Sequence, residues 1–166
     1  GAPAARLAAN MEESLGVPTA TTFRQLPVSV LESERARLNA ALASRDIKLS
    51  FTHIIAYALV LAWKKHPVMG HSYRATDGTA FRYTPSHLGL GLAVDVERKD
   101  GSRGLVVPVI KGADTLDFAT FHATYESFVA KARGNKLLPD DFSGAAMTLT
   151  NPGGLGEKQL VAGDEI

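Results

Sequence analysis

The sequence has no cysteine, and it has no excess of either charge. The lack of cysteine excludes disulfides, thiolate metal sites and a cysteine nucleophile. Lys and Arg number 18 and Asp and Glu number 17, so the formal net charge is only +1. Proteins that bind nucleic acids use an excess of basic residues against phosphates. We therefore expect no nucleic-acid partner.

Long hydrophobic runs are also missing. The longest apolar stretch, Ile54–Trp63, is well short of the roughly 20 residues that cross a bilayer, and residues 1–11 contain no apolar signal-peptide core. We expect a cytoplasmic protein with no membrane partner. Because the sequence starts at Gly1 and Met11 is internal, we also expect it to be part of a longer chain. Its 166 residues, 45% hydrophobic, are typical of a single globular domain over 1–166.

Helical periodicity and end signals predict four helices. Ser29 and Ser50 stand where N-caps stand, and the segment after Ser50 is apolar on nearly every face, which is typical of a central helix. The predicted helices cover 3–15, 30–43, 51–66 and 116–133.

Strand and turn signals fill most of the remaining sequence. Asp77-Gly78 is a strong hairpin signal, and Asp100-Gly101 predicts a second turn. The predicted strands cover 17–28, the two arms of a hairpin over 71–83, the paired segments 88–97 and 104–110, and 145–150. This order of elements predicts an α+β fold, with helices covering one side of a sheet.

An ordered set of motifs resembles the catalytic domain of the 2-oxoacid dehydrogenase acyltransferases. The wording is most similar to the acyltransferase-like domains fused to 2-oxoglutarate dehydrogenase or decarboxylase modules. The motifs are VPTATTF at 17–23, LSFTHIIAYAL at 49–59, Gly91–Asp95, Gly104–Ile110, Asp114, Gly134, Lys136–Leu137, Asp141–Phe142, Gly144 and MTLTNPGGLG at 147–156.

The resemblance implies both a fold and an activity. The fold is the two-layer α+β fold of chloramphenicol acetyltransferase, a mixed sheet covered by helices. The activity is transfer of an acyl group, here succinyl, between dihydrolipoamide and coenzyme A in the tricarboxylic acid cycle. The lipoyl group would be carried by another domain or protein. The resemblance also implies a homotrimer or larger cage with other 2-oxoacid dehydrogenase components as partners.

Thr150 is the main candidate for a catalytic role. The resemblance implies that a hydroxyl at this position donates to the oxyanion that forms when a thiol attacks a thioester. One such donor contributes roughly 100- to 1000-fold in rate. The alternative is that threonine ends the strand because of its β propensity alone.

Asp95 and Arg35 are the candidate supporting residues. Asp95 lies in an otherwise apolar run, so an inward-facing carboxylate there needs a partner. The resemblance implies that this aspartate maintains the architecture of the site, and it offers Arg35 as the companion. We predict an Arg35–Asp95 ion pair. The alternative is that both side chains face solvent.

The general base that the family uses is not in this sequence. The resemblance implies a histidine in a DHRxxDG motif near the end of the domain, contributed from a neighbouring subunit. None of the five histidines stands in such a motif, and His122 is predicted to be a packed or half-exposed helix residue. We therefore expect a C-terminally incomplete domain that is inactive alone.

Other binding chemistries find little support. Gly89 and Gly91 lie inside a strand without the remainder of a dinucleotide fingerprint, so we expect them to allow close strand packing. The basic turn with Arg98, Lys99 and Arg103 is interpreted as solvated. The scattered His, Asp and Glu residues form no recognisable ligand cluster, so no metal is expected.

Two other functions stay open at this point. The chain can be a non-catalytic domain that trimerises and carries partner enzymes. It can also be a small-molecule acetyltransferase of the same fold, although that reaction requires the same missing histidine.

Overall fold

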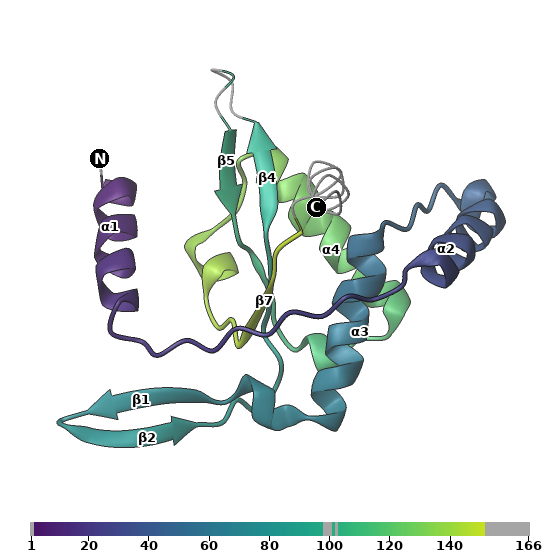
Figure 1. The fold of residues 1–166 in the computed structure, drawn as a ribbon. Helices are drawn as coiled ribbons and strands as arrows, with labels where there is room; N and C mark the ends of the chain where they lie inside the picture. The colour runs from purple at the N-terminus through teal and green to yellow at the C-terminus, as the bar shows by residue number, and fades with distance from the viewer. Residues whose placement is uncertain (1, 98–100, 102, 152–166) are drawn as a thin grey trace, which may run out of the picture. The chain divides into compact units, whose positions relative to one another are not determined.

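The computed structural model describes residues 2–97, 101 and 103–151, and its ribbon is drawn in Figure 1. The chain divides into two compact units, residues 1–34 and 35–166, and the single domain over 1–166 stays a prediction. The helices are α1 (Ala2–Ser14), α2 (Ser29–Leu42), α3 (Phe51–Lys65) and α4 (Phe118–Arg133); the strands are β1 (Ser72–Thr76), β2 (Thr79–Tyr83), β3 (Leu90–Leu92), β4 (Val94–Glu97), β5 (Arg103–Val106), β6 (Val109–Ile110) and β7 (Met147–Leu149).

The first unit holds α1 and the start of α2. Helix α1 confirms the helix predicted over 3–15. The strand predicted over 17–28 is wrong, because this segment forms neither helix nor strand. Its β-branched residues favour extended backbone, but a strand also needs a neighbour for its N–H and C=O groups. None of the strands in the described residues pairs with it.

Helix α3 begins at a capping box in which histidine takes the usual place of Glu or Gln. The Ser50 hydroxyl accepts from the His53 backbone N–H at 3.2 Å, and the Ser50 N–H donates to His53 Nδ1 at 3.1 Å. Two backbone donors at the start of the helix are thereby satisfied. The helix ends as predicted before Pro67, which starts a 3-10 turn.

The central sheet is mixed, with strand order β6-β3-β7. Strand β3 pairs antiparallel with β6 and parallel with β7. Two glycines allow this close packing, as the sequence predicted. A Cβ at Gly89 would collide with the Gly144 carbonyl oxygen, and one at Gly91 would lie 2.8 Å from Thr148 Oγ1.

Strands β4 and β5 continue the β3–β6 pairing in the same register. Leu90 pairs with Ile110 and Val94 with Val106. Between the two ladders, the Leu92 N–H donates to the Pro108 carbonyl at 2.9 Å, whereas proline itself has no N–H to return. The predicted pairing of 88–97 with 104–110 is confirmed; of its turn, residues 98–100 and 102 lie outside the described residues.

The remaining predicted elements are also present. Asp77 and Gly78 have φ of 51° and 76° and join β1 to β2 in a two-residue turn. Helix α4 starts at the Asp117 cap and ends in a Schellman arrangement, with Asn135 rather than Gly134 in the left-handed conformation. The Lys136 N–H donates to the Lys131 carbonyl at 2.8 Å, as this motif requires.

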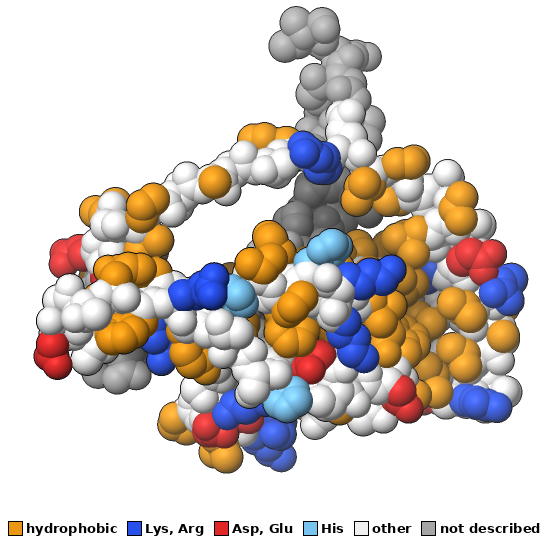
Figure 2. All heavy atoms as spheres, turned by 90° about the horizontal axis from the view of Figure 1, so that it is seen from below, with side chains coloured by type: hydrophobic (Ala, Val, Ile, Leu, Met, Phe, Trp, Pro, Cys, Tyr) orange, Lys and Arg blue, Asp and Glu red, His pale blue; other side chains and the backbone are white. Residues whose placement is uncertain are grey.

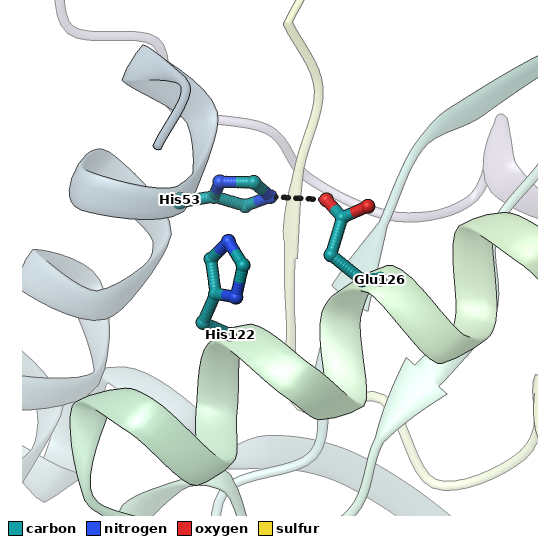
Figure 3. A group of neighbouring side chains, drawn as sticks. All are labelled: His53, His122 and Glu126. Atoms are coloured by element: carbon teal, nitrogen blue, oxygen red, sulfur yellow. Dashed lines mark ion pairs between the residues drawn. The ribbon is translucent and has the colours of Figure 1, made fainter. Parts of the chain in front are cut away.

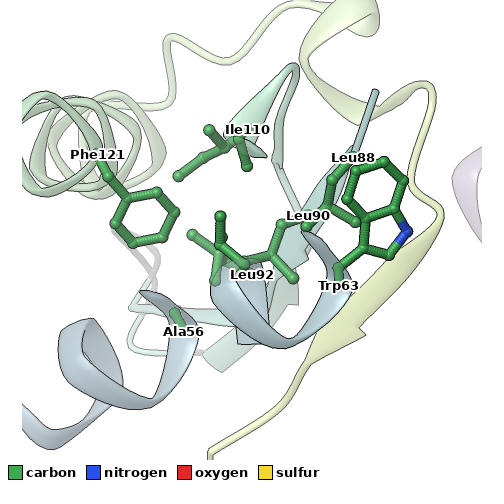
Figure 4. Packing of buried hydrophobic residues seen from close by; sticks show 9 residues of the cluster. Ala56, Trp63, Leu88, Leu90, Leu92, Ile110 and Phe121 are labelled. Carbon is green, nitrogen blue, oxygen red and sulfur yellow. The ribbon is translucent and has the colours of Figure 1, made fainter. Parts of the chain in front are cut away.

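Apolar side chains from α3, α4 and the sheet form the main core (Figure 4). Phe121 of α4 and Val60 of α3 are fully buried against β3 and β6. Full burial of a side chain of this size contributes about 1.5–3 kcal/mol. The buried members of the core are Ala56, Val60, Trp63, Leu88, Leu90, Leu92, Ile110, Ala113 and Phe121.

The surface of the second unit is not uniformly polar. Figure 2 shows hydrophobic side chains exposed among charged ones on the face that it draws. Exposed large hydrophobic residues of this unit include Val68, Met69, Tyr73, Phe81, Leu105 and Leu138. Among the described residues, no helix combines the length and the hydropathy that a membrane span requires.

Candidate active site

A polar pocket of about 590 Å³ lies at the junction between β3 and β4. Residues of α2, α3 and α4 also line it. The side chains around it come from segments far apart in the sequence. They are Arg35, Lys48, Leu49, Ser50, Thr52, His53, Ala93, Val94, Asp95, Arg103, Tyr125, Glu126, Val129, Arg133 and Asn151.

Thr150 is not itself a lining residue of this pocket, but it precedes one that is. It directly follows β7, and the Ala93 N–H donates to the carbonyl of the preceding Leu149 at 3.0 Å. The next residue, Asn151, lines the pocket and donates from Nδ2 to Thr52 Oγ1 at 2.8 Å. Thr150 itself is exposed in the single chain. The glycine-rich bend that follows, from Pro152, lies outside the described residues.

Asp95 faces the pocket and pairs with an arginine that the sequence analysis left on a solvated turn. It alternates with buried Val94 and Val96, so its side chain lies away from the core and is 47% exposed. Its carboxylate forms an ion pair with Arg103 of β5. Arg103 is a diagonal neighbour, because the residue directly opposite Asp95 is Leu105. This carboxylate raises the pKa of the Arg103 guanidinium above its ordinary value, first by its hydrogen bond and then by its charge.

Arg35 borders the same pocket without forming the predicted pair in this conformation. Its guanidinium carbon lies 4.3 Å from the centre of the Phe51 ring. Its Nε atom is buried and has no hydrogen-bond partner among the described residues. The Arg35–Asp95 ion pair therefore stays a prediction, although both residues lie on one pocket.

Among the described residues, His53 is the one polar residue that is buried, and its neighbours fix its proton (Figure 3). Because the Ser50 N–H donates to Nδ1, the neutral ring carries its proton on Nε2. That nitrogen lies 2.9 Å from Glu126 Oε1. Burial lowers the pKa of His53 from its ordinary value of 6.5, and the nearby His122 lowers it further.

The same residues correct the expectation that the sequence holds no ligand cluster. His53, His122 and Glu126 each place a possible ligand atom within 4.8 Å of the others. Their geometry could hold a metal ion, but a ligand nitrogen must offer a lone pair. With its Nδ1 accepting from Ser50, His53 would have to lose the Nε2 proton or give up that cap. The proton arrangement therefore favours a hydrogen-bonded cluster.

The position of His122 agrees with its predicted place in a helix. It lies half-buried in the middle of α4, and its Nε2 lies 3.2 Å from the Lys48 carbonyl oxygen. A carbonyl only accepts, so that nitrogen carries the proton in the neutral ring. His122 is not among the side chains that line the pocket.

The sequence analysis did not identify Arg103, His53 or Glu126 as neighbours of the site. Two signals were available. Arg103 stands opposite the strand that carries Asp95 once the hairpin register is set, and Glu126 stands four residues after His122 on one helix face. No local signal connects His53 to Glu126, since their contact depends on how α3 packs against α4.

The fold of this chain is similar to that of several solved structures. The dihydrolipoamide acetyltransferase of Azotobacter vinelandii superposes with a TM-score of 0.71 at 29% identity, over 85% of this chain and 56% of that one. In that enzyme a serine, a histidine and an asparagine have been investigated for their roles in the catalytic mechanism. The truncated catalytic core of the 2-oxoacid dehydrogenase complex from Thermoplasma acidophilum shares the fold, with a TM-score of 0.73 at 24% identity, over 93% and 67%. The fold is that of an acyltransferase catalytic core.

The family follows from the sequence match. The model of the 2-oxoacid dehydrogenases acyltransferase (catalytic domain) family matches residues 4–162, so the chain belongs to this family. It is 46% identical over 156 residues to the 2-oxoglutarate dehydrogenase E1/E2 component of Corynebacterium glutamicum. It is 48% identical over 154 residues to the multifunctional 2-oxoglutarate metabolism enzyme of Mycobacterium sp. strain JLS. The matches cover 93% and 92% of this chain but only 13% and 12% of those proteins.

Proposed function

We propose that this chain provides part of an active site that transfers a succinyl group between dihydrolipoamide and coenzyme A. Family membership supports acyl transfer, and the two relatives named for 2-oxoglutarate favour succinyl as the acyl group. The lipoyl group and coenzyme A act as substrates. The protein works in the cytoplasm, in the tricarboxylic acid cycle.

The observation that carries the proposal is the placement of Thr150. It ends β7 beside Ala93, and the adjacent Asn151 fixes the chain to the first turn of α3. The residues on either side of Thr150 are thus held by Ala93 and Thr52, and this supports a role for its hydroxyl beside the pocket. In the reaction a thiolate attacks the thioester carbonyl and the Thr150 O–H donates to the oxyanion; the intermediate then collapses as the original carbon–sulfur bond breaks and the other thiol leaves. Asp95 and Arg35 support the pocket wall.

The base is expected outside these residues. His53 has a hydrogen-bonded Nδ1 and a proton on Nε2, and His122 does not line the pocket. We therefore expect the thiol proton to be removed by a histidine that another subunit contributes. The 166 residues alone should show no acyl transfer to coenzyme A. Turnover by this segment that is lost on His122→Ala would contradict the assignment.

The decisive experiment compares three variants in the protein that carries the complete catalytic domain. Thr150→Ala should lower kcat for succinyl transfer from succinyl-CoA to dihydrolipoamide by roughly 100- to 1000-fold. Thr150→Ser keeps the hydroxyl and should retain most of the rate. Thr148→Ala, two residues earlier on β7, is the matched control. Equal rates for Thr150→Ala and Thr148→Ala would refute the role of Thr150.

Assembly is the second part of the proposal. The exposed hydrophobic residues of the second unit are of the kind that subunit contacts cover. A structural relative with a TM-score of 0.71 at 29% identity forms the cubic core of a pyruvate dehydrogenase complex. We expect a homotrimer or a larger cage together with other complex components. Sedimentation velocity should show a mass of at least three chains, and a monomer at micromolar concentration would contradict this.

A further inference from the structure

The charged side chains that line the pocket are more often cationic than acidic. Four lining residues are cationic, namely Arg35, Lys48, Arg103 and Arg133, and only Asp95 and Glu126 are acidic. Both acids are already engaged. Asp95 pairs with Arg103, and Glu126 lies against His53. Among the described lining residues the cations therefore outnumber the acids, four to two.

Arg35 is a cation of the pocket that is stacked on an aromatic ring. Its guanidinium lies over the Phe51 ring, and its buried Nε has no hydrogen-bond partner among the described residues. One turn further along α2, Asn39 donates to the Leu49 carbonyl at 3.0 Å and accepts from the Leu49 N–H at 2.7 Å. Because Arg35 and Asn39 are four residues apart, they share one face of the helix. The clamp at Asn39 thus directs Arg35 to the pocket.

A guanidinium held in this way suits a carboxylate ligand. Partial burial of a charge is costly unless an opposite charge meets it. The planar fork of arginine matches a carboxylate with two parallel N–H···O bonds, and stacking on an aromatic ring fixes the plane of that fork beforehand. Lys48 and Arg133, which lack such an aromatic support among the described contacts, are less well prepared.

The chain around Thr150 indicates the class of ligand. Arg35, Ala93 and Asn151 line the same hollow, and Thr150 stands between Asn151 and Leu149, whose carbonyl accepts from the Ala93 N–H. An acyl group whose thioester carbonyl meets Thr150 extends its far end into this hollow. We infer that Arg35 recognises the terminal carboxylate of a dicarboxylic acyl group and so makes the site selective for succinyl over acetyl thioesters. This inference rests on the proposed function, since it assumes that the thioester binds at Thr150.

The kinetic test compares two acyl donors in the protein with the complete catalytic domain. The quantity measured is the ratio of kcat/KM for succinyl-CoA to that for acetyl-CoA, with dihydrolipoamide as acceptor. Arg35→Gln should lower the ratio by about tenfold or more, because a buried polar contact then lacks its partner. Arg35→Lys keeps the charge without the fork and should fall between. Lys48→Gln, the matched control, removes a charge from the same pocket and should change the ratio by less than about threefold.

Three outcomes would overturn the inference. An equal loss for both donors would make Arg35 a structural residue, such as the partner of Asp95. An equal loss for Lys48→Gln would attribute the selectivity to general charge. A rise in KM that appears for free coenzyme A as acceptor in the reverse reaction would show that Arg35 binds a phosphate of the carrier instead of the acyl carboxylate.

A binding measurement separates this inference from the proposed function. In a Thr150→Ala background, calorimetry with S-succinyl-N-acetylcysteamine and S-acetyl-N-acetylcysteamine reports affinity without turnover. The succinyl compound should bind at least about tenfold more tightly, and Arg35→Gln should abolish the difference. Acyl transfer by a protein that does not prefer the succinyl compound would contradict this inference but not the proposed function. A protein with the complete catalytic domain that transfers no acyl group would contradict the proposed function, whatever its affinities for the two compounds.

Discussion

The core beside β3 and the pocket beside β4 share two helices, yet they are held together in different ways. Helix α3 gives Val60 to the core and His53 to the pocket, and α4 gives Phe121 to the core and Glu126 to the pocket. Apolar contact is non-directional and depends on volume, whereas a polar contact depends on which partner is in reach. The core should therefore respond to changes of size, and the pocket to changes of partner.

The largest expected effect is in the core. Phe121→Ala removes a fully buried ring and should lower the free energy of unfolding by about 3–5 kcal/mol, because the sheet and α3 cannot close the cavity. Denaturant unfolding measures it. Phe142→Ala makes the same change where the side chain is 45% exposed and should cost far less. Equal losses at the two positions would remove the distinction between core and surface on which the comparison rests.

The second effect is at the border of the two regions. Asn39→Ala leaves the N–H and C=O of Leu49 without their partners, although Leu49 is only 2% exposed. Leaving buried groups unpaired costs about 1–3 kcal/mol in the free energy of unfolding. Ser33→Ala on the same helix removes an exposed hydroxyl and serves as the control. A loss no greater than that of the control would show that α2 is not clamped through Asn39.

The third effect depends on pH. The folded protein lowers the pKa of His53 chiefly by burial, so the unfolded chain binds a proton at a higher pH than the folded chain does. Stability is therefore complete above about pH 6.5 and declines as the pH falls below that value, by at most about 1.4 kcal/mol per pH unit. His53→Asn should flatten the dependence of the free energy of unfolding on pH between 7 and 5. An unchanged slope would assign the dependence to another group.

The difference between the two regions also explains what could be predicted from the sequence. The core segments followed from apolar periodicity and from turn signals such as Asp77-Gly78, which depend on neighbours in the chain. The strand predicted over 17–28 was wrong, because β propensity cannot supply a pairing partner. Around the pocket, Arg35, Asp95 and Asn151 converge, but Asp95 takes Arg103 as its partner. From the sequence, several arginines are equally good partners for the Asp95 carboxylate. The register of β4 and β5 brings Arg103 to it.

The smallest expected effect tests that selection directly. Asp95→Asn should leave the midpoint of denaturant unfolding unchanged within error, because the Asp95 and Arg103 side chains are 47% and 72% exposed and water screens their attraction. A double-mutant cycle with Arg103→Gln should then give only a small coupling, and one with Arg35→Gln none at all. If Asp95 and Arg35 instead couple by more than the about 1 kcal/mol that exposed ion pairs reach, the pair predicted from the sequence forms in solution. Arg35 would then have its anion within the protein, and the succinyl carboxylate would have to be recognised elsewhere.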